Sequence, residues 1–305
     1  MPELPDVTVY VERLAALLVA QPIDAVRVAS PFVVRTYEPP LSAAEGRSVC
    51  AVRRLGKRVV IELSDELFLV IHLMVAGRFH WRARGARLGR PRGLLAFDFP
   101  SGTLLLTEAS QRKRASLHVV AGVAGLSDFD LGGIEPLEMT LEQFAAVMAR
   151  ENRTLKRALT DPRLVSGIGN AYSDEILHAA GLSPVALTQK LSNEETERLH
   201  RACQSTLSLW TERLRREVGD TFPERVSAFH DAMTVHGKFG RPCASCGTAV
   251  QRIRYRDNEC NYCPRCQTGG RLLADRSLSR LLRKDWPRSI EELEERGVAG
   301  GRRPP

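Results

Sequence analysis

The sequence predicts a multidomain α+β protein, in which a helix and a β-rich region are followed by a helical region and a cysteine-bearing ribbon. Short runs rich in Val, Ile, Leu and Phe recur through the first 121 residues, with turn residues between them. Helical spacing and helix-capping signals replace this pattern near residue 130. Five of the seven cysteines then fall between Cys243 and Cys266. These three observations give the fold class and the order of its parts.

The first part of the chain is predicted to contain one helix and several strands. Residues 7–18 place apolar side chains at helical spacing after Pro5 and Asp6, which are typical of a helix start. The close, regular spacing of the apolar runs that follow favours a sandwich or a barrel. Strands are expected over residues 24–29, 49–54, 58–63, 67–73, 94–99, 103–107 and 116–121.

Helix signals dominate the part of the chain that follows a linker at residues 131–137. Thr140 with Gln143, and Ser192 with Glu195, have the spacing of a capping box, which marks the first turn of a helix. Helices are expected over residues 140–150, 154–160, 170–180 and 192–218. The predicted domains are a β domain at 1–133, a helical domain at 138–236, a ribbon at 237–275, and an extension at 276–305. In the extension, short helices are expected at 278–282 and 290–296, before a disordered tail.

The ribbon has the cysteine spacing of a metal site. Cys243 with Cys246 and Cys263 with Cys266 form two Cys-x-x-Cys pairs, separated by a segment with a predicted β-hairpin. Four thiolates at this spacing are typical of a tetrahedral structural zinc site, so we expect one Zn²⁺ per chain. Cys260 forms a competing pair with Cys263, but a proline directly after Cys263 favours the Cys263 and Cys266 pair. The alternatives are that the cysteines bind no metal, or that the ribbon is only a structural clip.

The charge of the chain and its first residues bear on which partner the protein binds and where in the cell it acts. Lys and Arg number 44 against 36 Asp and Glu, and twelve of these bases against four acids lie at residues 237–288. This excess permits a polyanionic partner, although a solvated basic face is the alternative. The first six residues carry acids where a secretory signal needs bases, and no apolar run is long enough to span a membrane. We therefore expect a cytoplasmic protein.

The opening Met-Pro-Glu-Leu-Pro-Asp closely resembles that of the formamidopyrimidine-DNA glycosylase/endonuclease VIII (Fpg/Nei) family. Matching segments follow in the family's order: Gly56-Lys57-Arg58, residues 131–137, residues 165–175, and the cysteine ribbon. The resemblance runs from residue 1 to about residue 268. It implies a β-sandwich begun by a helix, a helical domain with a helix-two-turns-helix motif, and a zinc ribbon. It also implies that DNA lies in a cleft between the two halves of the protein.

The resemblance implies that Pro2, exposed once Met1 is removed, is the nucleophile of a bifunctional DNA glycosylase and AP lyase of base excision repair. A secondary amine that attacks C1′ of a damaged nucleotide expels the base and leaves an iminium ion. The iminium acidifies the C2′ hydrogen, so the strand is cleaved by β-elimination or by β,δ-elimination. The expected partner is double-stranded DNA with oxidised bases or abasic sites, bound by a monomer in the cytoplasm at the nucleoid. The alternatives are mainly an AP lyase, or a non-catalytic damaged-DNA-binding protein.

The same resemblance assigns roles to individual residues. Glu3 becomes the acid/base, although a carboxylate that only stabilises a helix start is the alternative. Lys57 becomes a phosphate contact that assists catalysis. Asn170 follows Gly-Ile-Gly at a predicted helix start, where free N–H groups bind phosphate, with a simple N-cap as the alternative. Lys156 is a further candidate phosphate contact.

Four departures from the family pattern bear on the substrate. The family's hairpin arginine is Asn258 here, and Arg256 lies two residues earlier as a candidate replacement. The second acid of the opening is Asp6 instead of Glu. The loop at residues 108–115 carries Arg112 and Arg114 as candidate DNA contacts and contains no aromatic residue. The segment after residue 218 is short for a lesion-capping loop. These departures favour an endonuclease VIII-like preference for oxidised pyrimidines or abasic sites.

Overall fold

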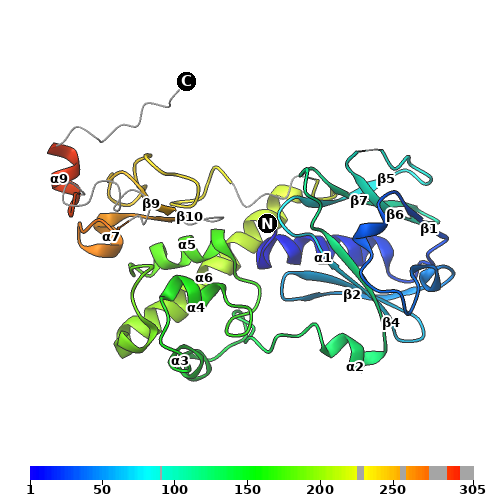
Figure 1. Cartoon of the computed structure of the whole chain (residues 1–305), viewed down its shortest axis with the longest axis horizontal. Coiled ribbons are helices and arrows are strands. Elements are labelled where there is room, and N and C mark those ends of the chain that lie inside the picture. The colour runs from blue at the N-terminus through cyan, green and yellow to red at the C-terminus, as the bar shows by residue number, and fades with distance from the viewer. Residues whose placement is uncertain (90, 225–229, 255–258, 275–286, 296–305) are drawn as a thin grey trace. The chain divides into compact units, whose positions relative to one another are not determined.

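The computed structural model describes residues 1–89, 91–224, 230–254, 259–274 and 287–295. It divides into two compact units (Figure 1). The first unit comprises Met1–Gly132 and Leu209–Ala228, and the second comprises Gly133–Ser208 and Phe229–Pro305. This partition differs from the predicted domain bounds in two respects. The end of the helical region joins the first unit, and the ribbon forms one unit with the remaining helices, because the ribbon packs on those helices through the contacts described below.

The first unit is a β-sandwich that opens with the helix α1 (Leu4–Leu18). One sheet has the strand order β1-β6-β7-β5 and the other has the order β2-β3-β4-β8, and the named pairs within each sheet are antiparallel. The strands are β1 (Ala25–Val28), β2 (Val49–Leu55), β3 (Arg58–Leu63), β4 (Leu67–His72), β5 (Gly77–Arg82), β6 (Gly93–Phe99), β7 (Gly102–Glu108) and β8 (Ser116–Ala121). The seven predicted strands are therefore present, and the predicted sandwich is confirmed.

The core of this unit lies between the two sheets and α1. Tyr10 and Leu14 of α1 pack in one buried cluster with Ile61 of one sheet and Phe97 of the other. The other face of the β2-β3-β4-β8 sheet is also covered, because Val60 packs in a second cluster that includes Leu126 of α2 (Gly122–Ser127). Burial on both faces explains why β3 and β4 are nearly continuous apolar runs.

Strand β5, with the sequence Gly-Arg-Phe-His-Trp-Arg, was not predicted, because it contains no Val, Ile or Leu and its polar positions are occupied by Arg and His. The turn before it depends on Gly77, whose amide donates to the carbonyl oxygen of Leu73 at 2.9 Å. A Cβ atom at Gly77 would lie 2.3 Å from that oxygen, so another residue does not fit without a backbone shift.

The second unit contains three shorter helices, α3 (Leu141–Ala149), α4 (Leu155–Thr160) and α5 (Asn170–Ala179), and the first part of α6 (Asn193–Val218). A hairpin of β9 (Gln251–Arg254) and β10 (Glu259–Tyr262) leads into α7 (Pro264–Thr268), and α9 (Ile290–Glu295) follows. Helix α5 lies against α4, α7 and β10. This places α5 between the helical part and the ribbon.

The predicted helix starts are confirmed in detail. Thr140 and Gln143 exchange side-chain and backbone hydrogen bonds at the start of α3. Ser192 and Glu195 do the same at the start of α6. The helix predicted at 290–296 is α9, whereas the helix predicted at 278–282 and the tail after 296 lie outside the described residues. No helix in the described ranges has the length and apolar character needed to cross a membrane.

Candidate active site and metal centre

The start of the chain is buried at the N-terminus of α1. Pro2, Glu3 and Asp6 are all buried, and Glu3 is only 1% exposed. Burial lowers the pKa of the terminal amine of Met1, and the positive charges of Arg78 and Lys57 act in the same direction. The acids Glu3 and Asp6 oppose these effects. The amine therefore lies within electrostatic reach of two carboxylates and two cations, which is the setting that an amine nucleophile needs.

Glu3 and Asp6 form a reciprocal capping box at the start of α1. The backbone N–H of Glu3 donates to Oδ2 of Asp6 at 2.8 Å. Glu3 therefore stabilises a helix start, which is the structural alternative given above for this residue. It does not exclude a chemical role, because one carboxylate can accept from the helix N-terminus and still face the chain terminus.

Asp6 is a buried carboxyl group with one oxygen unused. Its Oδ1 atom has no hydrogen-bond partner among the described residues, and the hydroxyl of Tyr10, one turn further along α1, has none either. Burial raises the pKa of Asp6 from 3.8 to about 7, against the opposing effect of its hydrogen bond with the backbone of Glu3. The group therefore exchanges its proton near neutral pH, which a surface aspartate does not do.

Lys57 lies in the turn between β2 and β3, where Gly56 adopts a positive φ of 60°. The side chain is half-buried, and its charge reaches both the terminal amine and His72 at the end of β4. Burial, aided by Arg58 and Lys57, lowers the pKa of His72 to about 4. His72 is therefore neutral at physiological pH, and its Nδ1 atom contacts Sδ of Met74 at 2.6 Å.

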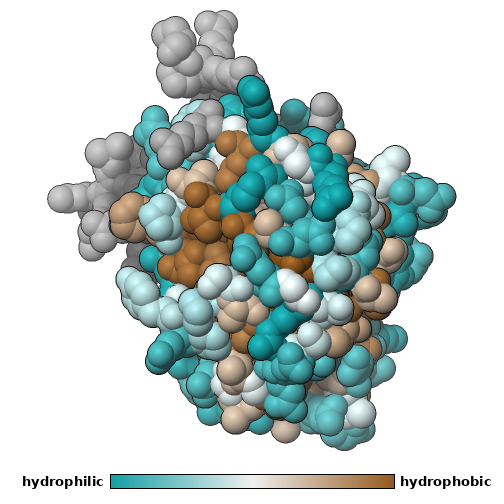
Figure 2. Space-filling model, turned by 90° about the vertical axis from the view of Figure 1, so that its right-hand side faces the viewer, coloured by the Kyte–Doolittle hydropathy of each residue, from teal (hydrophilic) through white to brown (hydrophobic). Residues whose placement is uncertain are grey.

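The turn after β4 presents one apolar side chain to solvent. Met74 adopts a positive φ of 53° and is held back against His72, whereas Val75 is 58% exposed. Figure 2 shows the surface on one side of the molecule, where an apolar area interrupts mostly hydrophilic side chains. Val75 is therefore the exposed apolar side chain of this turn.

The loop between β7 and β8 is organised by Glu108, which is 1% exposed. Its carboxylate accepts hydrogen bonds from the backbone N–H groups of Arg114 at 2.8 Å and Ala115 at 3.1 Å, and from the hydroxyl of Ser110 at 2.8 Å. The side chains of Arg112 and Arg114 are exposed. A rigid loop base with two exposed guanidinium groups suits contacts with phosphate.

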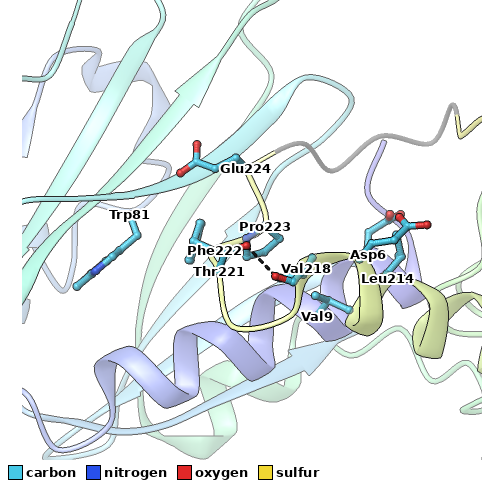
Figure 3. A pocket seen from close by; sticks show the side chains of 10 residues that line it. Asp6, Val9, Trp81, Leu214, Val218, Thr221, Phe222, Pro223 and Glu224 are labelled. Carbon is cyan, nitrogen blue, oxygen red and sulfur yellow. Dashed lines mark hydrogen bonds between the residues drawn. The ribbon is translucent and has the colours of Figure 1, made fainter.

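A cavity of about 640 Å³ in the first unit runs along α1. Asp6 and Val9 line it from α1, and Thr221, Phe222 and Pro223 line it from the segment after α6 (Figure 3). A hydrogen bond between Thr221 and Val218, drawn in Figure 3, closes the turn at the end of α6. The other lining residues are Trp81, Leu214, Glu217, Val218 and Glu224. The cavity therefore combines apolar walls with the buried acid of the chain start.

Glu224 attaches the segment after α6 to strand β5. Its carboxylate contacts Nδ1 of His80 at 2.5 Å and accepts a hydrogen bond from Arg82 at 2.9 Å. Nε2 of His80 contacts the hydroxyl of Thr107 in β7 at 3.0 Å. These contacts fix one wall of the cavity.

In the second unit, Asn170 is the first residue of α5, and the N-cap position is taken by Gly169. The side-chain amide of Asn170 donates to the carbonyl oxygen of Glu259 in β10 at 2.9 Å. The predicted helix start is correct, but the simple N-cap that we weighed does not describe Asn170. The residue instead joins the helix N-terminus to the ribbon hairpin.

The ammonium group of Lys156 lies inside the unit and not at the surface, where a contact with a DNA phosphate would need it. It is 9% exposed, and its ammonium group donates to Oδ1 of Asp174 at 2.5 Å and to the backbone oxygen of Asn170 at 2.6 Å. The charge is held inside the unit because the buried carboxylate of Asp174 requires a cation. We therefore do not include Lys156 among the proposed DNA contacts. Arg256 and Asn258 lie outside the described residues.

Two neighbouring acids of α5 bind the chain that leads into the ribbon. The carboxylate of Asp174 is fully buried and contacts Nδ1 of His236 at 2.8 Å. The carboxylate of Glu175 accepts from the backbone N–H groups of Thr234, Val235 and His236 at 2.8 to 2.9 Å. Burial alone would raise the pKa of Asp174, but Lys156 and His236 outweigh it and hold that pKa below its usual value.

The four predicted cysteines meet in one cluster. Their sulfur atoms all lie within 4.8 Å of one another, with 4.0 Å between Cys243 and Cys266 and 3.4 Å between Cys246 and Cys263. A zinc ion about 2.3 Å from each of four sulfurs requires the sulfurs to be roughly 3.8 Å apart. The geometry therefore fits a tetrahedral metal site. Nε2 of His178 in α5 lies 3.3 Å from Sγ of Cys243, which links the cluster to the same helix.

Cys260 takes no part in this cluster. It is 1% exposed and packs in a separate apolar group with Ile253, Tyr262 and Leu273. Burial raises the pKa of its thiol, which disfavours the thiolate that a metal needs. The structure therefore places Cys263 with Cys266 in the metal cluster and leaves Cys260 outside it, as the proline after Cys263 suggested.

Comparison with known proteins identifies the family. Residues 1–120 match the model of the formamidopyrimidine-DNA glycosylase N-terminal domain, and residues 133–216 match that of the formamidopyrimidine-DNA glycosylase H2TH domain. The chain is 33% identical over 261 residues to the formamidopyrimidine-DNA glycosylase of Moorella thermoacetica, a match that covers 83% of this chain and 95% of that relative. The chain belongs to the Fpg/Nei family. The resemblance inferred from the five segments is therefore confirmed.

Solved structures of this family support the fold class. The Lactococcus lactis Fpg in complex with DNA that contains an oxidized pyrimidine has a TM-score of 0.77 at 24% identity, covering 88% of this chain and 100% of that one. The same protein in complex with abasic-site DNA has a TM-score of 0.76 at 24% identity, covering 87% and 99%. The predicted order of β-sandwich, helix-two-turns-helix region and four-cysteine ribbon is confirmed.

Sequence reasoning missed several polar residues that are buried or half-buried in the structure. Glu108, Asp174, Glu175, Glu224 and His236 were not singled out, yet each organises a loop or joins two segments. For Asp174 and Glu175 a signal was available, because they are the only charged residues among residues 165–177 and acids are rarely buried unless they are paired.

Proposed function

We propose that this chain is a bifunctional DNA glycosylase and AP lyase whose nucleophile is the amine of Pro2 after removal of Met1. The observation that carries the proposal is the buried start of the chain, where the terminal amine lies within electrostatic reach of Glu3, Asp6, Lys57 and Arg78. An amine in a buried site, within electrostatic reach of two carboxylates and two cations, has no evident purpose in holding the fold together. It has one in covalent catalysis.

The environment favours the nucleophilic form of the amine. In the chain that still carries Met1, burial, Arg78 and Lys57 lower the pKa of the terminal amine. We propose that the same surroundings, with the positive end of α1, lower the pKa of the Pro2 amine once Met1 is removed. When the neutral amine of Pro2 attacks C1′, an N–C bond forms, the glycosidic bond breaks, and the base leaves with its electron pair. The nitrogen then loses its proton, the C1′–O4′ bond breaks and O4′ takes up a proton, which opens the sugar ring and leaves a cationic iminium. This iminium has no N–H proton left to lose, because the amine is secondary. Loss of the C2′ proton then expels the 3′ phosphate by β-elimination.

Glu3 is the proposed acid/base of these steps. Its carboxylate is 1% exposed and lies next to the nucleophile in the chain. Burial keeps it out of bulk water, so a proton can pass between Glu3 and the sugar during ring opening. Lys57 supplies a positive charge within reach of the same terminus and is one of the proposed phosphate contacts of this unit.

DNA binding is proposed to use residues of both units. Arg112 and Arg114 are exposed on the loop after β7, and Asn170 is the first residue of α5, whose N-terminus is the positive end of the helix dipole and favours phosphate. The partner is double-stranded DNA with a damaged base or an abasic site. The relatives in complex with damaged DNA support this choice.

One Zn²⁺ held by Cys243, Cys246, Cys263 and Cys266 is proposed to stabilise the ribbon. The four sulfurs leave no open position for a substrate or water, so the metal is structural. We propose oxidised pyrimidines and abasic sites as the preferred lesions, because Asp6 is shorter than the family's glutamate and the segment between α6 and residue 230 is short.

Borohydride trapping on a panel of oligonucleotides tests this function. Purified protein is incubated with duplexes that carry one oxidised pyrimidine, one oxidised purine, or one abasic site, and the iminium is then reduced. We expect a trapped adduct on oxidised pyrimidine and abasic DNA. Trapping at abasic sites alone would leave only the lyase. Binding without trapping on any duplex would make the chain a non-catalytic DNA-binding protein and contradict the proposal.

A further inference from the structure

We propose that Asp174 is a positioning residue for DNA binding. Its buried carboxylate holds Asn170 and strand β10 in a fixed position relative to each other. This inference rests on the proposed function, because that function assigns Asn170 to DNA contact. It concerns a group that touches no DNA itself, and it predicts that a buried charge in the second unit sets the affinity for DNA.

Asp174 gathers three segments that are far apart in the sequence. Its carboxylate is fully buried and binds Lys156 of α4 through Oδ1 at 2.5 Å. Oδ2 contacts Nδ1 of His236 at 2.8 Å and accepts the backbone N–H of Asn261 in β10 at 3.1 Å. Helix α4, helix α5, the segment before the ribbon and the hairpin strand therefore share one carboxylate.

The same contacts close a ring around Asn170. Lys156 donates to the backbone oxygen of Asn170 at 2.6 Å as well as to Asp174. The side chain of Asn170 donates to the carbonyl oxygen of Glu259, two residues before Asn261 in the same strand. Asp174 thus reaches Asn170 by two routes, through Lys156 on one side and through β10 on the other. Movement of the carboxylate would therefore shift both the backbone and the side chain of Asn170.

The ring requires a carboxylate rather than any polar group. An ionised aspartate offers only acceptors, and its hydrogen-bond neighbours here can all donate. They are an ammonium, an imidazole nitrogen, and the backbone N–H and side-chain amide of Asn261. An asparagine would turn an NH₂ group toward at least one of these donors. The buried charge of Lys156 would also lose its counter-ion.

Glu175 offers a matched control within the same helix. Its carboxylate also ties α5 to the segment before the ribbon, through the N–H groups of residues 234–236. The hydrogen bonds described for it do not include Asn170, Lys156 or β10. A role that is only structural, in docking the ribbon, would be shared by Asp174 and Glu175. A role in setting the register of Asn170 belongs to Asp174.

The test measures DNA binding by fluorescence anisotropy with the zinc-loaded, full-length protein and a duplex that carries a non-cleavable abasic-site analogue. We expect Asp174→Asn and Lys156→Met each to raise Kd by about tenfold. Glu175→Gln should change Kd by less than about threefold. Zinc content and the unfolding midpoint are measured for each variant, and Lys156→Met keeps the test informative if Asp174→Asn does not fold.

A double-mutant cycle separates positioning from simple destabilisation. If Asp174 acts through Asn170, then Asp174→Asn should have little further effect on Kd in an Asn170→Ala background. The single-turnover rate at saturating DNA should change little, because the proposed chemistry belongs to the first unit. Multiplicative effects of the two substitutions, or wild-type affinity in folded Asp174→Asn and Lys156→Met proteins, would overturn the inference. Because binding needs no chemistry, absence of borohydride trapping would count only against the proposed function.

Discussion

At the scale of single residues, the acids at the chain start carry two kinds of function at once. Glu3 and Asp6 cap α1, and they also lie within electrostatic reach of the terminal amine. The sequence motif predicted their importance but not their physical state. Nothing in the sequence shows that Oδ1 of Asp6 is buried without a partner among the described residues, since that depends on strands and loops far along the chain.

The raised pKa of Asp6 predicts a pH dependence of stability. The carboxyl group keeps its proton to about pH 7 in the folded protein, whereas the unfolded chain loses it near 3.8. Between these values the folded state binds more protons, so the free energy of unfolding should fall as pH rises through this window. Asp6→Asn should remove that part of the decline, because the amide does not titrate. Thermal unfolding of both proteins from about pH 4 to pH 8 measures it, and parallel curves would contradict the assigned pKa.

At the scale of elements, the sequence predicted what local patterns encode. The capping boxes at Thr140 and Ser192 gave the starts of α3 and α6, because a capping box is made within one turn of chain. Strand β5 was missed because its alternation includes Arg and His, which are held there by partners elsewhere, such as Glu224 for His80. Lys156 was predicted as a phosphate contact and is instead a buried ion-pair partner. The sequence pattern did not reveal this, because its counter-ion Asp174 lies on another helix.

The separation of Cys260 from the metal cluster predicts different effects of two cysteine substitutions. Cys266→Ala removes one of the four clustered sulfurs, so we expect loss of bound zinc and of DNA binding. Cys260→Ala should keep one zinc per chain, because Cys260 packs with Ile253 and Tyr262 instead. Metal analysis of the two purified proteins measures this. Zinc loss in the Cys260 variant together with zinc retention in the Cys266 variant would show that the ligand set is wrong.

At the scale of the whole molecule, the order of the parts followed from composition and spacing, but the grouping into units did not. The ribbon lies in one compact unit with the helices before it, through contacts of Asp174, Glu175 and His178 of α5. Residues from Leu209 onward in α6 instead belong with the sandwich. Such groupings depend on side chains that are distant in sequence, so periodicity cannot reveal them.

The central claim is that the amine of residue 2 forms the covalent bond with DNA, and mass spectrometry of the reduced adduct tests it most directly. The protein is trapped with borohydride on abasic-site DNA, digested with protease and nuclease, and the modified peptide is sequenced. We predict that Met1 is absent and that the residual sugar is attached to the nitrogen of Pro2. A sugar attached to Lys57 or to any other amine, with Pro2 unmodified, would contradict the account.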